Sequence, residues 1–431
     1  MRHLSDSTCG PLLLACLCLG ASACHTLVFD AVTDVDTEET DSTDSDSTVP
    51  DTDTSSGDDT EDTEDTAPDP PFDIPAAIPA CASLRPDTGA VGDLRPFVVG
   101  DGTPESCNET TLRNAVTLLN ENGGGLISFD CGVHQVTVTL LQPLTVSAGV
   151  TFHMDGGGRV TLDGRNTTRI LSAGYDVQMV LRNTAFTRGL ASNAGNGGAI
   201  LFADGGTYGS LTVSGCLFYH NVSEQGRGGA LFTEELQTVQ IYRSVFTENY
   251  GAYGGAIFVW GKNLLISDSQ FTGNEVFGEG GAVNYDGYSY VSGTERLAVC
   301  GSRFRHNTSV HHGSALKAYL YEDNVAVYTH CEFLGNENTS DGSSGNGYGA
   351  LYHHGAPMEL ANSSFIDNLT GTSAAGLYLD AEGTATVTNC TFAGNRSLGD
   401  GSFGGAIFHT EDSAGTYRNC TFAGNRASTG S

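Results

Sequence analysis

The chain has 431 residues, with 51 Asp and Glu against 19 Lys and Arg, and a formal net charge of −32 at pH 7. This balance argues against nucleic-acid binding and against attraction to anionic lipid surfaces. The 57 glycines, set against a single tryptophan, favour a fold of stacked turns over a compact enzyme.

Residues 1–23 predict a secretory signal. Arg2 and His3 precede an apolar stretch, Leu12 to Ala23, that is too short to cross a bilayer as a helix. Cys24 would then be a lipidated first residue, although Ala21 stands where a bacterial lipobox prefers Leu. Ordinary cleavage after Ala23 and a weaker lipidation site at Cys16 are the alternatives. We expect the protein to be exported, either as a lipoprotein of the outer membrane or cell surface or as a secreted protein. Any contact with the membrane would be made only by the N-terminal lipid anchor.

Residues 24–80 predict a disordered acidic tether. Residues 30–73 contain 18 Asp or Glu, many Ser and Thr, and no Lys or Arg. Such a stretch buries too little apolar surface to offset the entropy lost on ordering.

Residues 81–135 are expected to form an N-terminal cap with the first strand. A helix is predicted from about Thr111 to Asn120, because its apolar residues share one face. These residues are Leu112, Ala115, Val116 and Leu119. The helix would cover the open end of the following domain and its unpaired edge. Cys107 and Cys131 bracket it and predict a disulfide in an oxidising compartment, with Cys81 as an alternative partner for either cysteine.

Residues 136–431 carry an internal repeat. A Phe-x-x-Asn motif recurs eight times, at Phe218/Asn221, Phe246/Asn249, Phe271/Asn274, Phe304/Asn307, Phe333/Asn336, Phe365/Asn368, Phe392/Asn395 and Phe422/Asn425. Gly-Gly-Ala-like triplets accompany it, starting at Gly197, Gly228, Gly254, Gly280, Gly313, Tyr348, Ala374 and Gly404. A period of roughly 25–35 residues indicates a solenoid.

Each period contains about three short β-branched or aromatic runs, which predicts one coil of an all-β, right-handed parallel β-helix of the pectin-lyase-like kind, with about ten coils. The repeated Asn suits a sharp turn, and the repeated Phe suits an internal stack. Small residues two positions before each Phe form a third column. All three columns are interpreted as scaffold, so a functional site is expected where the repeat is interrupted.

The Gly-Gly-Ala and Phe-x-x-Asn repeat resembles that of the chlamydial polymorphic outer-membrane proteins and related bacterial surface β-helices. The segment Ser106–Gly132 and the Asp155-Gly156-Gly157-Gly158 turn are similar to the opening of secreted pectate-lyase-like proteins. The resemblance covers residues ~95–431 and implies a fold and a surface or secreted location. It does not imply one activity, because this fold carries lyases, hydrolases, esterases and adhesins.

Signatures of the familiar sugar-cleaving families are missing. The repeats contain no Asp-Asp pair, no Gly-His-Gly and no Arg-Ile-Lys, and no Trp-x-Asp-His occurs. Acidic residues follow many of the Gly-Gly-Ala strands and offer oxygen ligands for a possible Ca²⁺, or simply decorate solvated turns. These residues are Asp204, Glu234, Glu235, Asp286, Glu322, Asp323, Asp380, Glu382, Glu411 and Asp412. No other cofactor is expected.

Three functions remain open. The first is a surface-displayed β-helix that acts in adhesion or glycan binding, with a polysaccharide or a glycan of a host or neighbouring cell as its partner. The second is a polysaccharide lyase or glycoside hydrolase of pectate-lyase-like fold. The third is a structural stalk of the envelope. The missing signatures favour the first.

The candidate site lies between about Asn284 and His354. After the Gly-Gly-Ala-Ile motif most coils carry an apolar residue, but two adjacent coils carry Asn284 and Lys317. The same region has the longest insertions and four histidines, and loops on a rigid scaffold often bind ligands. Expected ligand contacts are Asn284, Tyr285, Asp286, Tyr288, Tyr290, His312, Lys317, Tyr321, His353 and His354. If there is catalysis, Lys317, His311 and Tyr319 are the candidates. The alternative is that the loop insertions have no function, because solenoids tolerate insertions, and that the tyrosines only cover the sheet.

The chain stops six residues after Asn425, with no segment to cover a final coil. Because an open β-edge is an aggregation hazard, this predicts either a fragment or an end covered by another chain.

Overall fold

The structure is a computed structural model that describes residues 76–86, 94–193, 195–202, 208–287, 296–321, 324–340, 347–380 and 384–428. The signal sequence, Cys24 and the tether up to residue 75 therefore lie outside the described residues. Tyr288 and Tyr290 lie outside them as well.

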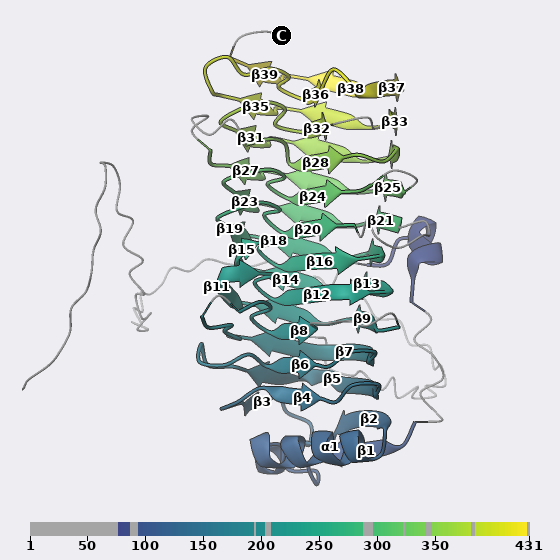
Figure 1. Ribbon diagram of the computed structural model, residues 1–431, viewed down its shortest axis with the longest axis vertical. Helices are drawn as coiled ribbons and strands as arrows, with labels where there is room; N and C mark the ends of the chain where they lie inside the picture. The colour runs from purple at the N-terminus through teal and green to yellow at the C-terminus, as the bar shows by residue number, and fades with distance from the viewer. Residues whose placement is uncertain are drawn as a thin grey trace, which may run out of the picture. The chain divides into compact units, whose positions relative to one another are not determined.

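The repeats form a right-handed parallel β-helix built from three sheets, as the sequence predicts (Figure 1). The strand pairings among the described residues are parallel. Each pairing joins equivalent positions of successive coils, for example Leu264 with Leu297. One of the three sheets, which we call sheet B, has ten strands within the described residues, in agreement with the expected number of about ten coils. The Gly-Gly-Ala strands lie side by side in this sheet, as expected.

Sheet A has two rows of strands, which the long strands β5 and β7 connect. The first row is β1 (Pro96–Val99), β2 (Gly124–Phe129), β5 (Thr151–Asp163), β7 (Gln178–Thr187), β9 (Ser210–Ser214), β13 (Thr238–Tyr242), β17 (Asn263–Ser267), β21 (Arg296–Cys300), β25 (Val325–Thr329), β29 (Met358–Ala361), β33 (Thr384–Thr388) and β37 (Ala414–Arg418). The second row is β3 (Val136–Thr139), β10 (Leu217–Tyr219), β14 (Val245–Thr247), β18 (Gln270–Thr272), β22 (Arg303–Arg305), β26 (Glu332–Leu334), β30 (Ser364–Ile366), β34 (Thr391–Ala393) and β38 (Thr421–Ala423).

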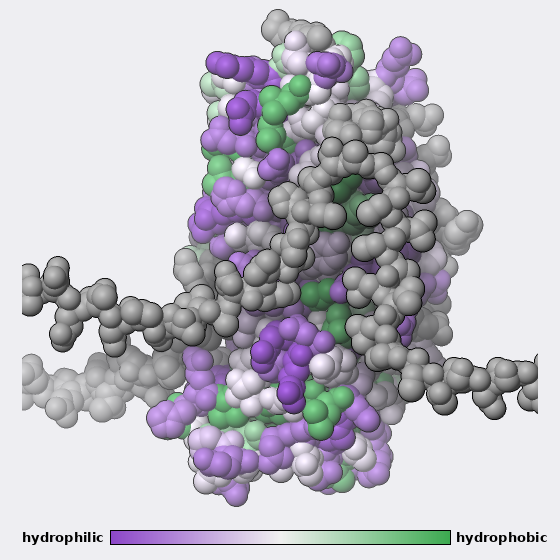
Figure 2. Space-filling model, turned by 90° about the vertical axis from the view of Figure 1, so that its left-hand side faces the viewer, coloured by the Kyte–Doolittle hydropathy of each residue, from purple (hydrophilic) through white to green (hydrophobic). Residues whose placement is uncertain are grey.

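Sheets B and C complete each coil. Sheet B consists of β4 (Leu144–Val146), β6 (Leu171–Ala173), β8 (Ile200–Phe202), β12 (Leu231–Leu236), β16 (Ile257–Gly261), β20 (Val283–Asp286), β24 (Leu316–Tyr319), β28 (Leu351–His354), β32 (Leu377–Asp380) and β36 (Ile407–His409). Sheet C consists of β11 (Val222–Arg227), β15 (Tyr250–Tyr253), β19 (Glu275–Val276), β23 (Thr308–Ser309), β27 (Glu337–Asn338), β31 (Leu369–Thr370), β35 (Arg396–Ser397) and β39 (Arg426–Ala427). Figure 2 views the side on which sheet C lies in Figure 1 and shows hydrophilic residues interspersed with hydrophobic ones.

The repeated Asn residues form a continuous buried hydrogen-bond ladder along one turn. In one step, the Asn274 amide Nδ2 donates to Asn307 Oδ1 at 2.9 Å and to the Phe246 carbonyl at 3.0 Å. The same step recurs from Asn221 to Asn425. Because each amide satisfies two backbone or side-chain groups that would otherwise be buried without partners, the scaffold role predicted for these residues is confirmed.

The repeated Phe residues stack inside the β-helix with ring centroids 4.5–5.2 Å apart, from Phe218 to Phe422. The small residues two positions earlier are linked in a similar way, since the Ser244 hydroxyl accepts from the Cys216 amide at 3.2 Å. Burial raises the pKa of the Cys216 and Cys331 thiols to about 12, so both remain protonated. These free cysteines therefore serve as small buried side chains.

The N-terminal end is capped by α1 (Glu109–Glu121), which packs against β1, β2 and β4. Its buried face consists of the four residues predicted, Leu112, Ala115, Val116 and Leu119. The Asn108 side chain accepts from the Thr110 and Thr111 amides and so caps the helix. A short 3-10 turn, η3 (Pro104–Ser106), precedes it. Cys107 and Cys131 form the disulfide proposed as one of the alternatives.

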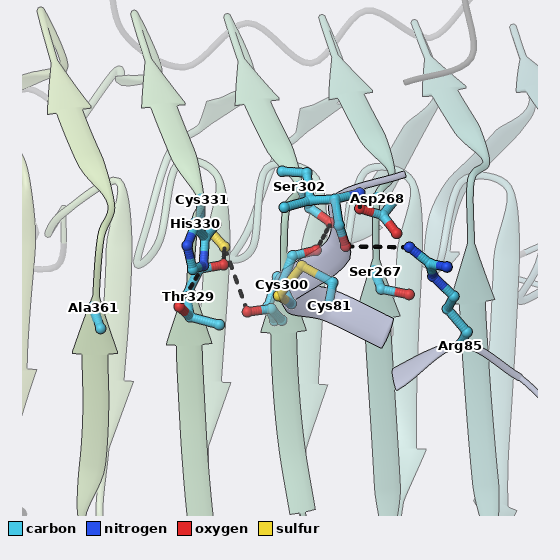
Figure 3. The surroundings of a disulfide bond; sticks show 12 residues. Cys81, Arg85, Ser267, Asp268, Cys300, Ser302, Thr329, His330, Cys331 and Ala361 are labelled. Atoms are coloured by element: carbon cyan, nitrogen blue, oxygen red, sulfur yellow. Dashed lines mark hydrogen bonds between the residues drawn. A yellow bond between two sulfur atoms is a disulfide. The ribbon is translucent and has the colours of Figure 1, made fainter. Parts of the chain in front are cut away.

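The alternative pairing of Cys81 with the cap is wrong, because Cys81 is bonded to Cys300 on β21. The 3-10 turn η1 (Pro79–Leu84) crosses the outer face of sheet A beside β17 and β21, as Figures 1 and 3 show. We call residues 76–86 the strap. Residues 76–80 were expected in the tether, but they belong to this ordered strap because its apolar side chains cover Leu265 and Ala298. Among the described residues, no helix has the length and apolarity to span a membrane.

Candidate functional site

The outward face of sheet B carries two parallel columns of side chains, because alternate residues of a strand point to opposite faces. In register along the first column are Leu201, Phe232, Phe258, Asn284, Lys317, Tyr352, Tyr378 and Phe408. Along the second are Glu234, Trp260, Asp286, Tyr319, His354 and Asp380. The interruption expected at Asn284 and Lys317 therefore lies in the middle of an aromatic column.

A third column borders the first one, at the residue that precedes each Gly-Gly-Ala triplet. In the central coil this residue is Glu279, and Gly280 after it has a φ of 71°. A Cβ at Gly280 would lie 2.5 Å from the Val283 carbonyl oxygen, so only glycine fits this turn between sheets C and B. The turn brings the Glu279 backbone next to the next outward side chain, Asn284, whose Nδ2 donates to the Glu279 carbonyl at 3.3 Å.

Glu279 and Lys317 form the ionic centre of the face. The Lys317 Nζ lies 3.0 Å from Glu279 Oε2, and both side chains are largely shielded from solvent. The same ammonium lies 5.3 Å from the centroid of the Tyr319 ring. His312 Nε2 lies 3.9 Å from Glu279 Oε1, and the imidazole stacks on Tyr352 with centroids 4.5 Å apart. Burial is the main cause of a lowered pKa at His312, so this imidazole is neutral at pH 7.

Two polar atoms beside this pair have no hydrogen-bond partner among the described residues. They are Asn284 Oδ1 and His312 Nδ1. Asn284 is 1% exposed, and its Nδ2 bond to the Glu279 carbonyl sets the orientation of the amide. A buried acceptor without a donor costs about 1–3 kcal/mol, so such atoms point to a group that binds there.

Asp380 organises the C-terminal half of the face. Its Oδ2 accepts from the Tyr352 hydroxyl and lies 3.0 Å from His354 Nδ1. Burial, followed by the hydrogen bond to Asp380, raises the pKa of Tyr352 far above its usual value, so this hydroxyl remains a donor. The His354 ring stacks on Tyr319 with centroids 4.0 Å apart.

Asp286 is the half-buried acid at the N-terminal edge of the cluster. Burial raises the pKa of its carboxyl, and the positive charges of Lys317 and Arg227 oppose this shift. A carboxyl with a raised pKa can hold a proton at higher pH than a solvated one, which is what a general acid requires.

Aromatic rings extend from the cluster in both directions along the coils. On the N-terminal side Phe232 and Phe258 lie in contact, and the Arg227 guanidinium lies 4.9 Å from the Phe258 ring centroid. On the C-terminal side Tyr352, Tyr378 and Phe408 stack at centroid distances of 5.5 and 5.3 Å. Phe232, Phe258, Tyr352 and Tyr378 are each less than a tenth exposed, whereas Trp260, Tyr319 and Phe408 are partly exposed. Partly exposed rings can pack against the apolar faces of sugar units, while tyrosine hydroxyls make hydrogen bonds.

Two surface hollows lie elsewhere on the chain. One, of about 300 Å³, is lined by Leu190 and Glu224, and the other, of about 320 Å³, by Glu109 and Arg113. Neither contains a side chain of the sheet-B cluster. The sheet-B face is therefore defined by its side chains and not by a cavity.

Comparison with known proteins identifies the fold family. The family described as the right handed beta helix region matches residues 175–365 and 291–430, which together span more than half of the chain. The chain belongs to the right-handed β-helix family.

Individual relatives of this β-helix are distant. Metabotropic glutamate receptor-like protein R of Dictyostelium discoideum is 25% identical over 187 residues, which are 42% of this chain and 11% of that protein. The crystal structure of bacteriophage CBA120 tailspike protein 3 is similar at 11% identity and a TM-score of 0.26, over 72% of this chain and 58% of that one. The match thus spans about a tenth of the receptor-like protein and less than two thirds of the tailspike.

The β-helix brings together most of the residues predicted for the site. Asn284, Asp286, His312, Lys317, Tyr319 and His354 lie on the outward face of sheet B, and the Tyr321 ring meets that of Tyr319 edge to face at 5.2 Å. His311 lies next to His312 at the turn after β23, and its Nδ1 has no partner among the described residues. Burial raises the pKa of the Tyr319 hydroxyl, which makes it a poor candidate for a base.

The predictions for Tyr285 and His353 are wrong, because both side chains point into the β-helix. Tyr285 is fully buried, and its hydroxyl donates to the Lys262 carbonyl at 2.9 Å. His353 Nε2 lies 2.7 Å from the Ala356 carbonyl oxygen, and burial lowers the pKa of this histidine to about 4. Strands β20 and β28 continue through these positions, so the two-residue period places them inward.

Sequence reasoning missed Glu279 and the partnership of Tyr352 with Asp380. The available signal for Glu279 was its place immediately before a Gly-Gly-Ala triplet, where neighbouring coils carry Tyr253 and His312. Within the described ranges, no group of three or more His, Cys, Asp or Glu side chains could hold a metal ion. Asp204, Glu322, Asp323 and Glu382 lie outside those ranges.

Proposed function

We propose that the outward face of sheet B binds a glycan, and that the protein is exported and acts in adhesion or glycan recognition. The observation that supports this proposal most strongly is the pair of unpartnered polar atoms, Asn284 Oδ1 and His312 Nδ1, within a column of aromatic rings. A sugar offers hydroxyl groups to such atoms and apolar ring faces to the aromatic side chains. Lipid attachment at Cys24 belongs to the same proposal and would display this face at a cell surface.

Binding of the full chain to a glycan array tests the proposal. Two variants address the face: Tyr378→Ala removes a stacking ring, and Lys317→Ala removes the buried cation. Each should weaken binding at least about tenfold, because central interface residues typically contribute 1–2 kcal/mol or more. Tyr175→Ala, at an exposed tyrosine outside sheet B, is the matched control and should leave binding unchanged. Unchanged binding in folded Tyr378→Ala and Lys317→Ala would place the binding site elsewhere.

Glycoside hydrolysis is a second candidate, and the half-buried Asp286 supports it. A hydrolase uses one protonated carboxyl as acid and a second, ionised carboxyl as base or nucleophile. Asp286, with its raised pKa, suits the first role, and Glu279, whose charge acts on Asp286, suits the second. Incubation of the chain with polysaccharides, reading reducing ends and absorbance at about 235 nm, separates hydrolysis from uronate elimination and from binding alone. If hydrolysis occurs, Asp286→Asn should abolish new reducing ends while glycan binding persists.

A further inference from the structure

The charges of the sheet-B face indicate which sugars it can accept. Four acidic side chains lie in its three columns, namely Glu234, Glu279, Asp286 and Asp380, against two permanent cations, Arg227 and Lys317. Burial lowers the pKa of His312, so this histidine adds little positive charge at pH 7. The face therefore carries a net negative charge.

Both cations are already engaged. The Lys317 ammonium pairs with Glu279 at 3.0 Å, with 11% and 24% of the two side chains exposed. The Arg227 guanidinium lies over the Phe258 ring. A ligand carboxylate would have to displace Glu279 from Lys317 and leave that glutamate charged in a poorly solvated place, which is costly.

The unpartnered acceptor also discriminates between ligand groups. Asn284 Oδ1 requires a hydrogen-bond donor, and its amide cannot simply turn over because Nδ2 is bonded to the Glu279 carbonyl. A sugar hydroxyl can donate to this oxygen. An ionised carboxylate at this position has only acceptor atoms and would leave Asn284 Oδ1 unsatisfied, whereas the ring hydroxyls of either a neutral sugar or a uronate can donate to it.

We infer that the sheet-B face selects neutral sugar units and rejects uronates, because Glu279 already pairs with the central cation Lys317 and the acidic side chains of the face repel a ligand carboxylate. This inference rests on the proposed function and names the ligand class of the same site. It excludes uronate elimination at this face, since that reaction needs a cation to neutralise the uronate carboxylate.

Matched glycan pairs test this inference with the full chain. The probes are hexamers of glucan, mannan and galactan, each compared with glucuronan, mannuronan and galacturonan of the same length. By calorimetry or interferometry, the unmodified chain should bind at least one neutral hexamer at least about tenfold more tightly than its uronate counterpart. Any residual uronate binding should strengthen as salt is added, because screening weakens the repulsion. Uronate binding that weakens as salt is added would indicate attraction instead of repulsion. This result for the unmodified chain alone would contradict the inference.

Glu279→Gln gives the sharper test. It keeps the shape of the side chain but releases the charge of Lys317, so the preference for the neutral hexamer should shrink at least about threefold. Glu275→Gln, on exposed β19 of the same coil, changes the net charge equally and should leave the preference unaltered. A uronate bound at least as tightly as its neutral partner by the unmodified chain overturns the inference but leaves glycan binding standing. If no glycan of the array or of this panel binds, the proposed function fails, and the inference fails with it.

Discussion

Cys81 is disulfide-bonded to Cys300, which lies 219 residues further along the chain, in the middle of sheet A. Around this bond, Leu84 packs with Ala298 and Leu265, and the Ile78 amide donates to Asp268 Oδ1 at 2.8 Å. Figure 3 shows Asp268 beside the disulfide. The strap thus joins the β-helix at its side and not through the N-terminal cap. Residue 76 lies on the outer face of sheet A, whereas the candidate site lies on the outer face of sheet B.

The first prediction concerns this bond. The double variant Cys81→Ser/Cys300→Ser should leave the β-helix folded, because the Asn and Phe ladders do not involve either residue. The strap should detach more often, and the Ile78 and Cys81 amides should exchange hydrogen at least about tenfold faster. Loss of a native disulfide typically costs about 2–5 kcal/mol, so the melting temperature should also fall.

Hydrogen–deuterium exchange followed by mass spectrometry measures the protection of the strap amides directly. The matched control is Cys107→Ser/Cys131→Ser, which removes the disulfide beside α1 and should leave exchange in residues 76–86 unchanged. Equal protection of the strap with and without Cys81–Cys300 would mean that the contacts of Leu84 and Asp268 hold it without the bond.

The ladders were predictable from sequence, and the strap was not. Each Asn and Phe of the repeat occupies the same place in every coil, so recognising the period gives their neighbours directly. The partner of Cys81 depends on the path of a short segment that belongs to no repeat. Nothing in the local pattern relates this segment to β21, and connectivity does not follow from cysteine spacing.

The candidate site was half predictable for a similar reason. Asn284 and Lys317 were recognisable because they interrupt a column that other coils fill with apolar residues. Tyr285 was misplaced because its segment was interpreted as an inserted loop, and His353 because it was grouped with the other histidines of the region. Both residues continue strands, whose side chains alternate in direction. Glu279 was missed because its importance depends on a contact with Lys317 of the next coil.

The second prediction concerns the Asn ladder. Asn274→Ala removes a fully buried amide that donates to Asn307 Oδ1 and Phe246 O and accepts from Asn249 Nδ2. Because several buried groups lose their partner at once, we expect a loss of about 2–4 kcal/mol and a lower melting temperature, with glycan binding retained. Asn425→Ala, in the half-exposed final step of the ladder, is the control and should cost clearly less. Equal melting temperatures for both variants would disprove the structural role of the ladder.

The third prediction concerns pH and the buried His353. Its pKa is about 4 in the folded chain, because burial disfavours the charged imidazole, and about 6.5 when unfolded. Between these values the unfolded chain takes up a proton that the folded chain does not. Stability should therefore fall as the pH decreases from about 6.5 to 4, and His353 should account for a loss of about 3 kcal/mol at pH 4.

Denaturant unfolding at several pH values measures this contribution. In His353→Gln the decrease in stability over the same pH range should be smaller by about that amount, whatever the stability at pH 7. Val133→Gln introduces the same side chain at an exposed position without removing an imidazole and should reproduce the slope of the unmodified chain. An unchanged slope in His353→Gln would show that His353 does not titrate differently in the two states.

The last prediction separates the ring of Tyr352 from its hydroxyl. Tyr352→Phe keeps the stacking on His312 and Tyr378 but removes the donor to Asp380, which also contacts His354. We expect a loss of about 1–2 kcal/mol, because the carboxylate loses a hydrogen-bond donor in a poorly solvated place. Tyr352→Ala should cost about 3 kcal/mol or more, since it also leaves a gap in the aromatic column. Tyr378→Phe removes a hydroxyl from the next ring of the same column and is the matched control. If Tyr352→Phe and Tyr378→Phe melt at the same temperature, the hydrogen bond to Asp380 contributes nothing measurable, and packing alone maintains this half of the face.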